Sequence, residues 1–187
     1  MTTGLVLVDI QNDYFPGGKM ELVGINEAVK NVQQLLQYFR SNQLPTFHIQ
    51  HFFEINSNAG FFIRGTEGVE LHESIQPLPG DLVISKNYPN GFRETSLLDE
   101  LKKAEVEDLV ICGAMSHMCI DATTRAAADL GFNCVVVHDA CATKDLQFGD
   151  KTINAEDVQG AFMNALGFAY ANVVKVSEFK ERLPKNH

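Results

Sequence analysis

The stretch "DLVICGAMSHMCIDATTRAAADLGF" (residues 108–132) carries the pattern that decides the fold. Residues 108–114 are strand-forming and mostly apolar, as expected of a strand buried inside a parallel sheet. Residues 117–130 have helical character, and Gly131 supplies a common helix end. A buried strand that leads through a short turn into a helix is typical of α/β proteins, so this stretch predicts that class.

Outward from this stretch, short strand-like runs alternate with helical patterns. Strands are expected at 4–10, 45–53, 81–86, 133–140 and 172–176, and helices at 26–42, at 94–104 and after Asn154. Ser96 and Asp99 resemble a capping box for the second helix. The order of elements predicts one domain over residues 1–187, with helices on both faces of a mostly parallel sheet. The segments 54–80 and 141–153 have little regular pattern and are expected to be loops over a site.

The composition excludes several classes of partner. Apolar residues make up 45% of the chain and charged residues 21%, which is ordinary for a soluble globular protein. A net charge of −9 argues against binding to nucleic acid or to an anionic membrane, and favours a small-molecule substrate. No apolar run approaches the roughly 18 residues that span a bilayer. The N-terminus lacks the pattern of a signal peptide, so we expect a cytoplasmic protein.

The four cysteines differ in their surroundings. Cys112 and Cys134 lie inside apolar runs and are expected in the core, while Cys141 is expected in a loop. The short C-x-x-C pairs of zinc ribbons are absent, and disulfides are not expected in a cytosolic α/β protein. Cys119 stands apart, because it follows a buried strand at the point where a helix starts.

Three reactive side chains follow the predicted strands. Asp9 ends the first strand, Lys86 ends the third, and Cys119 follows the fourth. Ligands of open α/β sheets bind at the carboxyl ends of the strands, so these groups are expected at one edge. A helix start and a nearby lysine favour the thiolate of Cys119. Asp9, with a pKa raised by burial, could take the thiol proton, which gives the parts for acyl transfer through a thioester.

Each of these residues also has a purely structural interpretation. A cysteine near a helix start is more often structural, an aspartate at a strand end can bind a loop amide, and a lysine at a strand end is usually solvated. The occurrence of all three at equivalent strand ends favours catalysis. A redox thiol protein and a catalytically silent binding module stay open as alternatives.

Four segments resemble a known family. These are "LVLVDIQNDYFPGG" (5–18), "VISKNYPNGFRETSL" (83–97), "ICGAMSHMCIDATTRAAADLGF" (111–132) and "HDACAT" (138–143). They are similar, in the same order, to motifs of the isochorismatase-like cysteine hydrolases, and the similarity runs from about residue 4 to about residue 176. The resemblance implies a Rossmann-like, three-layer α/β/α sandwich with a six-stranded parallel sheet of order 3-2-1-4-5-6. It also implies a dimer or tetramer.

The resemblance gives the site residues specific roles. Carried over by position, the family's catalytic triad falls on Asp9, Lys86 and Cys119. The two amides of the oxyanion hole belong to Met115 and Cys119, and a cis peptide bond is implied between Ala114 and Met115.

The retained cysteine indicates the type of bond. Family members that cleave the vinyl ether of isochorismate lack it, so Cys119 implies a C–N bond, as in amidohydrolases; an ester, thioester or vinyl ether stays open. In the nicotinamidase branch the metal-ligand positions fall on His51, Phe53 and Phe61. Phenylalanine cannot bind a metal, and His48 and His51 point to opposite faces of a strand. We therefore expect neither metal nor cofactor.

Aromatic side chains take the place of that metal site. Tyr14, Phe52, Phe61 and Phe92 are candidates for substrate binding, with packing in the core as the alternative for each. Tyr14 occupies the aromatic position that contacts substrate in the family. A largely apolar wall suits a planar or cyclic amide. The loop "FFIRGTEGVELHESI" (61–75) resembles the streptothricin-hydrolase-like branch.

Overall fold

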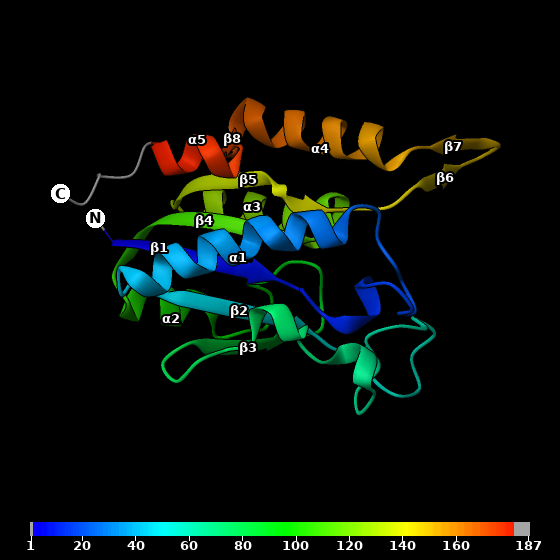
Figure 1. Ribbon diagram of the computed structural model, residues 1–187, viewed down its shortest axis with the longest axis horizontal. Helices are drawn as coiled ribbons and strands as arrows, with labels where there is room; N and C mark the ends of the chain where they lie inside the picture. The colour runs from blue at the N-terminus through cyan, green and yellow to red at the C-terminus, as the bar shows by residue number, and fades with distance from the viewer. Residues whose placement is uncertain (1, 182–187) are drawn as a thin grey trace.

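The computed structural model describes residues 2–181, in which six parallel strands form one central sheet (Figure 1). The strands are β1 (Thr2–Val8), β2 (Thr46–His51), β3 (Leu82–Lys86), β4 (Val106–Ala114), β5 (Asn133–Ala142) and β8 (Asn172–Val174). They are arranged in the order β3-β2-β1-β4-β5-β8, and every neighbouring pair is parallel. Because β8 is the sixth strand of this sheet, the predicted order is confirmed.

Helices cover both faces of the sheet and make three layers. The helices are α1 (Ile25–Ser41), α2 (Leu97–Lys103), α3 (Asp121–Asp129), α4 (Ala155–Ala169) and α5 (Val176–Glu181). Successive residues of β1 point to opposite faces: Leu5 and Leu7 pack with α1 and α5, whereas Val6 and Val8 pack with α2, α3 and α4. Within residues 2–181, no helix has the length and apolar character that crossing a bilayer requires.

Two helix starts are capped differently from the sequence expectation. Ser96 precedes α2, but its side chain makes no capping bond; the Leu97 amide donates instead to Thr95 Oγ1 at 3.3 Å. Asn154 precedes α4, and there the Ala155 amide donates to Asp145 Oδ1 at 2.7 Å. The predicted helix starts are therefore right within a few residues, while the predicted capping box is wrong.

The segment 141–153 is not the irregular loop that the sequence suggested. Strand β5 continues through Cys141 to Ala142, so this cysteine is buried in the sheet, and the four cysteines are free thiols. Beyond it, β6 (Leu146–Phe148) and β7 (Lys151–Ile153) form an antiparallel hairpin that extends away from the body (Figure 1). The segment 54–80 contains two 3₁₀ turns, η2 (Glu67–Val69) and η3 (Glu73–Ile75).

The two central strands, β1 and β4, meet where the strand order reverses. Their register pairs Val8 with Gly113, near the carboxyl ends of both strands. Gly113 has a φ of +123°, and a Cβ at this position would overlap the backbone of Val8. A glycine is therefore required for this close approach. Ligands of open α/β sheets bind at the carboxyl ends of the strands next to such a reversal of strand order.

Candidate active site

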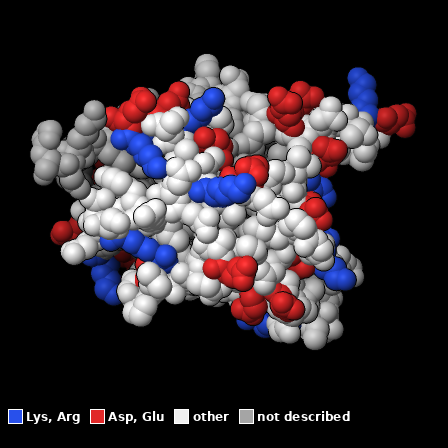
Figure 2. Space-filling model, in the orientation of Figure 1, with Lys and Arg blue, Asp and Glu red and all other residues white. Residues whose placement is uncertain are grey.

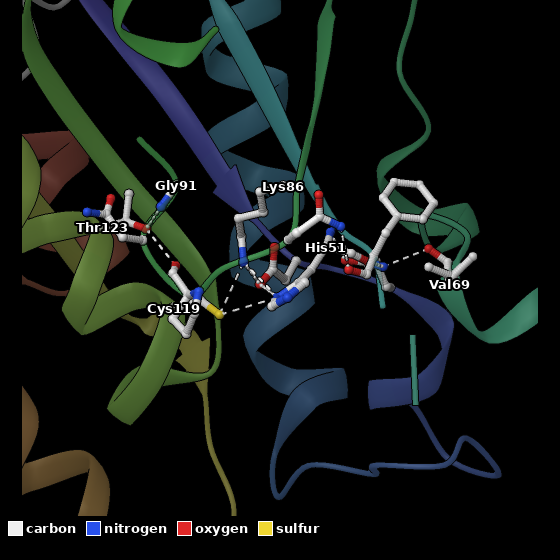
Figure 3. Close-up of polar contacts among 12 residues, drawn as sticks. His51, Val69, Lys86, Gly91, Cys119 and Thr123 are labelled. Atoms are coloured by element: carbon white, nitrogen blue, oxygen red, sulfur yellow. Dashed lines mark hydrogen bonds and ion pairs between the residues drawn. The ribbon is translucent and has the colours of Figure 1, made fainter. Parts of the chain in front are cut away.

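The structure brings Asp9, Lys86 and Cys119 together at the carboxyl edge of the sheet (Figure 3). Lys86 Nζ lies 2.7 Å from Asp9 Oδ2 and 3.3 Å from Cys119 Sγ. All three residues are buried, with exposed fractions of 0% for Asp9, 1% for Lys86 and 3% for Cys119. An acid, an ammonium and a thiol thus lie together in one buried site.

Each side chain owes its place to the strand before it. Asp9 directly follows β1 with a φ of +52°, and its amide donates to the Ile49 carbonyl of the neighbouring β2 at 3.0 Å. Lys86 is the last residue of β3. Cys119 lies in a π-helical turn, η4 (Ser116–Ile120), which leads directly into α3. The sheet therefore aligns three segments that are far apart in the chain.

The turn before Cys119 has an unusual backbone. The peptide bond between Ala114 and Met115 is cis, at the place where the resemblance implied one. The Met115 carbonyl accepts hydrogen bonds from the amides of Met118 at 3.0 Å and Ile120 at 3.2 Å, which closes the turn around Cys119.

His51 is a fourth member of the cluster that the sequence reasoning missed (Figure 3). Its Nδ1 atom lies 2.9 Å from Lys86 Nζ, 3.6 Å from Asp9 Oδ2 and 3.9 Å from Cys119 Sγ. The sequence analysis considered this histidine only as a metal ligand. Its place at the end of β2, between β1 and β3 in the sheet, was the available signal.

The pKa of Asp9 is lowered, so the expectation of a raised pKa is wrong. Burial alone would raise the pKa of this carboxyl, but the positive charge of Lys86 and the hydrogen bond that Lys86 donates act against burial, and the pKa is lowered. Asp9 is therefore ionised in the resting site, where it can accept a proton.

The pKa of Cys119 is raised well above that of a free thiol. Burial is the largest cause, and the carboxylate of Asp9 adds to it, while Lys86 offsets only part of the shift. The expected preference for the thiolate is thus wrong for the resting site. The cysteine holds its proton beside an ionised acid.

Three potential metal-ligand atoms converge at the same place. One atom each from Asp9, His51 and Cys119 lies within 4.8 Å of the other two. All three contact the ammonium of Lys86, at 2.7, 2.9 and 3.3 Å. The ammonium is the cation that these atoms bind, and a metal ion could bind them only by displacing it.

The residues at the nicotinamidase ligand positions do not fit a metal. The Phe53 ring lies 4.5 Å from the His51 ring and 5.3 Å from the Phe61 ring, so two of the three positions are apolar. His48 points to the other face of β2, where its Nε2 lies 3.4 Å from Asp81 Oδ2. Beside the buried cluster, Phe53 and Phe61 form an aromatic wall together with Tyr14 and Phe62.

Two of the four candidate substrate-binding residues belong to that wall. The Tyr14 ring lies 6.1 Å from Phe61 and 4.5 Å from Phe62. Burial raises the pKa of Tyr14 well above its usual value, and the negative charge of Asp9 raises it further. Tyr14 therefore lies close enough to the cluster to interact with its charges.

The other two candidates contact different parts of the protein. The guanidinium of Arg64 lies 4.4 Å above the Phe52 ring. The Phe92 ring stacks on Phe132 at 6.2 Å, next to the α2 and α3 core. Phe52 packs against the same core cluster as Tyr14 and Phe62, and Phe92 packs against the cluster that contains Cys119.

Comparison with known proteins identifies the class to which this fold and site belong. A sequence model of the isochorismatase domain matches residues 3–165. The chain therefore belongs to the isochorismatase family of hydrolases.

Relatives match over most of the chain. An uncharacterized family member from Bacillus subtilis is 51% identical over 179 residues, covering 96% of this chain and 99% of its own. Streptothricin hydrolase of Streptomyces noursei is 33% identical over 147 residues, covering 76% of this chain and 50% of its own. The crystal structure of an isochorismatase from Pseudomonas putida superposes with a TM-score of 0.89 at 33% identity, covering 94% of this chain and 89% of that one.

Proposed function

We propose that this protein is a cysteine hydrolase that cleaves a C–N bond of a small amide-type substrate through a thioester on Cys119. The observation that supports it most directly is the position of the Lys86 ammonium, 2.7 Å from the Asp9 carboxylate and 3.3 Å from the Cys119 sulfur. A thiol, a base and a cation in a buried site are the components of nucleophilic acyl transfer.

In the first half of the reaction, Asp9 takes the proton of the Cys119 thiol. The sulfur then forms a bond to the substrate carbonyl carbon, and the carbonyl oxygen becomes an oxyanion held by the amides of Met115 and Cys119. As the C–N bond breaks, protonated Asp9 returns its proton to the leaving nitrogen. Amine or ammonia departs, and the acyl group stays on sulfur as a thioester.

In the second half, water replaces the amine. Asp9 takes one proton from the water, whose oxygen bonds to the thioester carbonyl carbon. The C–S bond then breaks, the carboxylic acid leaves, and the sulfur regains a proton from Asp9. Lys86 stays charged throughout and stabilises the sulfur whenever it is anionic.

Two observations agree with a small substrate that carries a planar group, as an amide does. Streptothricin hydrolase, the relative that matches 76% of this chain, is by its name a hydrolase of streptothricin. The aromatic wall of Tyr14, Phe61 and Phe62 suits a planar group. The net charge of −9, with acidic and basic side chains interspersed on the face that Figure 2 shows, agrees with a small substrate and not with a nucleic acid.

The test is a screen of small amides, ureides and imides for release of ammonia or amine. Cys119→Ala protein serves as the blank, and Cys134→Ala as the matched control that changes a different buried thiol. We expect turnover by the wild type and by Cys134→Ala only, together with an acyl adduct on Cys119 in mass spectra of trapped reactions. Turnover of esters or vinyl ethers alone would replace the C–N assignment, and activity retained by Cys119→Ala would refute the covalent mechanism.

A further inference from the structure

The ammonium of Lys86 has a complete set of acceptors. Its Nζ atom lies 2.7 Å from Asp9 Oδ2, 2.9 Å from His51 Nδ1 and 3.3 Å from Cys119 Sγ. An ammonium has three N–H donors and no acceptor. Each of its hydrogens therefore has one partner, and the direction of the ammonium is fixed by all three.

These contacts decide the tautomer of His51. Since an ammonium can only donate, His51 Nδ1 is the acceptor in this contact, which places the ring hydrogen on Nε2. His51 Nε2 is buried without a hydrogen-bond partner among residues 2–181. His51 thus acts on the cluster through Nδ1.

A buried glutamine holds His51 in this place. Gln11 Oε1 accepts from the His51 amide at 2.8 Å, and Gln11 Nε2 donates to the His51 carbonyl at 2.9 Å. The same Nε2 donates to the Val69 carbonyl at 2.7 Å. Gln11 therefore binds both the amide and the carbonyl of His51, and these two hydrogen bonds fix the backbone from which the imidazole reaches Lys86.

We propose that His51 is a positioning residue, whose Nδ1 atom holds the ammonium of Lys86 between Asp9 and the sulfur of Cys119. Without this acceptor, one N–H of a buried ammonium has no partner, and the carboxylate at 2.7 Å attracts the ammonium more than a neutral thiol does. The ammonium then turns toward Asp9, and the thiolate of Cys119 loses stabilisation. This inference rests on the proposed function, because it gives Lys86 the role of stabilising that thiolate.

Two substitutions distinguish the role of the hydrogen-bond acceptor of His51 from that of its aromatic ring. In His51→Asn, the side-chain Oδ1 lies one bond from Cγ, as Nδ1 does, and can accept from Lys86. In His51→Phe, the ring is kept and the acceptor is lost. His51→Gln places its carbonyl further out, near the position of Nε2 and away from Lys86, and it replaces His51→Phe if the Phe protein does not fold.

The readout is the rate of Cys119 alkylation by iodoacetamide between pH 6 and pH 10, followed by intact-protein mass spectrometry. Cys119→Ala protein gives the background from the other cysteines. We expect His51→Phe to react about tenfold more slowly at pH 8, with its profile moved to higher pH, as loss of a charge-assisted hydrogen bond implies. His51→Asn should stay within about twofold of the wild type.

An unchanged profile in folded His51→Phe and His51→Gln overturns the proposal. It is also overturned if His51→Asn is impaired as strongly as His51→Phe, since the imidazole would then be needed for something other than its acceptor. Alkylation is measured without substrate, so this result is independent of the turnover screen. A failed screen refutes the proposed hydrolase and leaves the alkylation result to decide the role of His51.

Discussion

The charge on Lys86 controls how the neighbouring acid and thiol titrate. It lowers the pKa of Asp9 and opposes the rise in the pKa of Cys119. In Lys86→Met, which keeps most of the side-chain length, we expect alkylation of Cys119 to need a higher pH. The same change leaves the Asp9 carboxylate buried without its cation, which costs about 3–5 kcal/mol of stability.

Alkylation rates across pH and urea unfolding curves measure both effects. Lys103→Met is the matched control, because Lys103 lies on the exposed side of α2 and, among residues 2–181, forms an ion pair with Glu100 alone, at 3.6 Å. It should change neither quantity by more than a small amount. An unaltered alkylation profile in Lys86→Met would remove this lysine from its proposed role.

The lowered pKa of Asp9 also predicts how stability depends on pH. A carboxyl whose folded pKa lies below its unfolded value, about 3.9, stabilises the fold above that value. This stabilisation is lost as the pH falls through the folded pKa. In Asp9→Asn the stabilisation is absent at every pH, so we expect the free energy of unfolding to fall less between pH 7 and pH 3 than in the wild type.

Denaturant unfolding at the two pH values checks this expectation. The other carboxyl with a strongly lowered pKa, Asp81, at about 2, contributes to acid unfolding in both proteins and so cancels in the comparison. Equal losses of stability in the wild type and in Asp9→Asn would show that the charge of Asp9 is not coupled to folding.

Among the elements, the β6–β7 hairpin and α4 present apolar side chains to solvent. Phe148 on the hairpin is 79% exposed, and Phe168 on α4 is 91% exposed. An isolated two-stranded hairpin is marginally stable in water, and exposed phenylalanines favour association. We propose that these two elements form the contact of a homo-oligomer.

Phe148→Asp and Phe168→Asp should therefore shift the protein to a smaller species. Size-exclusion chromatography with light scattering measures the mass directly. Leu78→Asp is the matched control, because Leu78 is 53% exposed at the other end of the sheet, just before β3. A mass that is the same in all three variants and in the wild type would exclude this contact.

The accuracy of the sequence prediction varied with the length of the elements. The core strands and the longer helices were predicted within a few residues, since each has enough positions to show its period. Strands β6 and β7 have three residues each and lie largely exposed, so they lack the apolar run that marked the equally short β8. Cys141 was misplaced because the register of β4 and β5 shifts between Ile111 and Gly113, so that β5 extends past the apolar run that predicted it.

The site was only partly predictable for a different reason. The rule of strand ends selected Asp9, Lys86 and Cys119, and the structure brings them together. The same rule would have selected His51, had it been considered as anything besides a metal ligand. The protonation of Asp9 and Cys119 was predicted wrongly, because it depends on burial and on distances that exist only in the assembled molecule.

Taken as a whole, the molecule carries a net charge of −9, and Figure 2 shows Asp and Glu side chains spread over the face that it draws. Such a surface attracts divalent cations without any dedicated site, so we expect purified protein to carry some metal. At the proposed active site, the Lys86 ammonium already contacts the three atoms that could bind an ion. We therefore expect metal bound at the surface to have no part in the proposed hydrolysis.

Removal of metal with EDTA should leave both turnover and the pH profile of Cys119 alkylation unchanged. Elemental analysis before and after treatment shows that metal was removed, and a nicotinamidase of the metal-binding branch serves as the positive control for its loss. If activity disappeared with the metal and returned when zinc or manganese was added back, an ion rather than the ammonium would be the functional cation of Asp9, His51 and Cys119. Lys86→Met should then still turn over substrate, which the ammonium mechanism forbids.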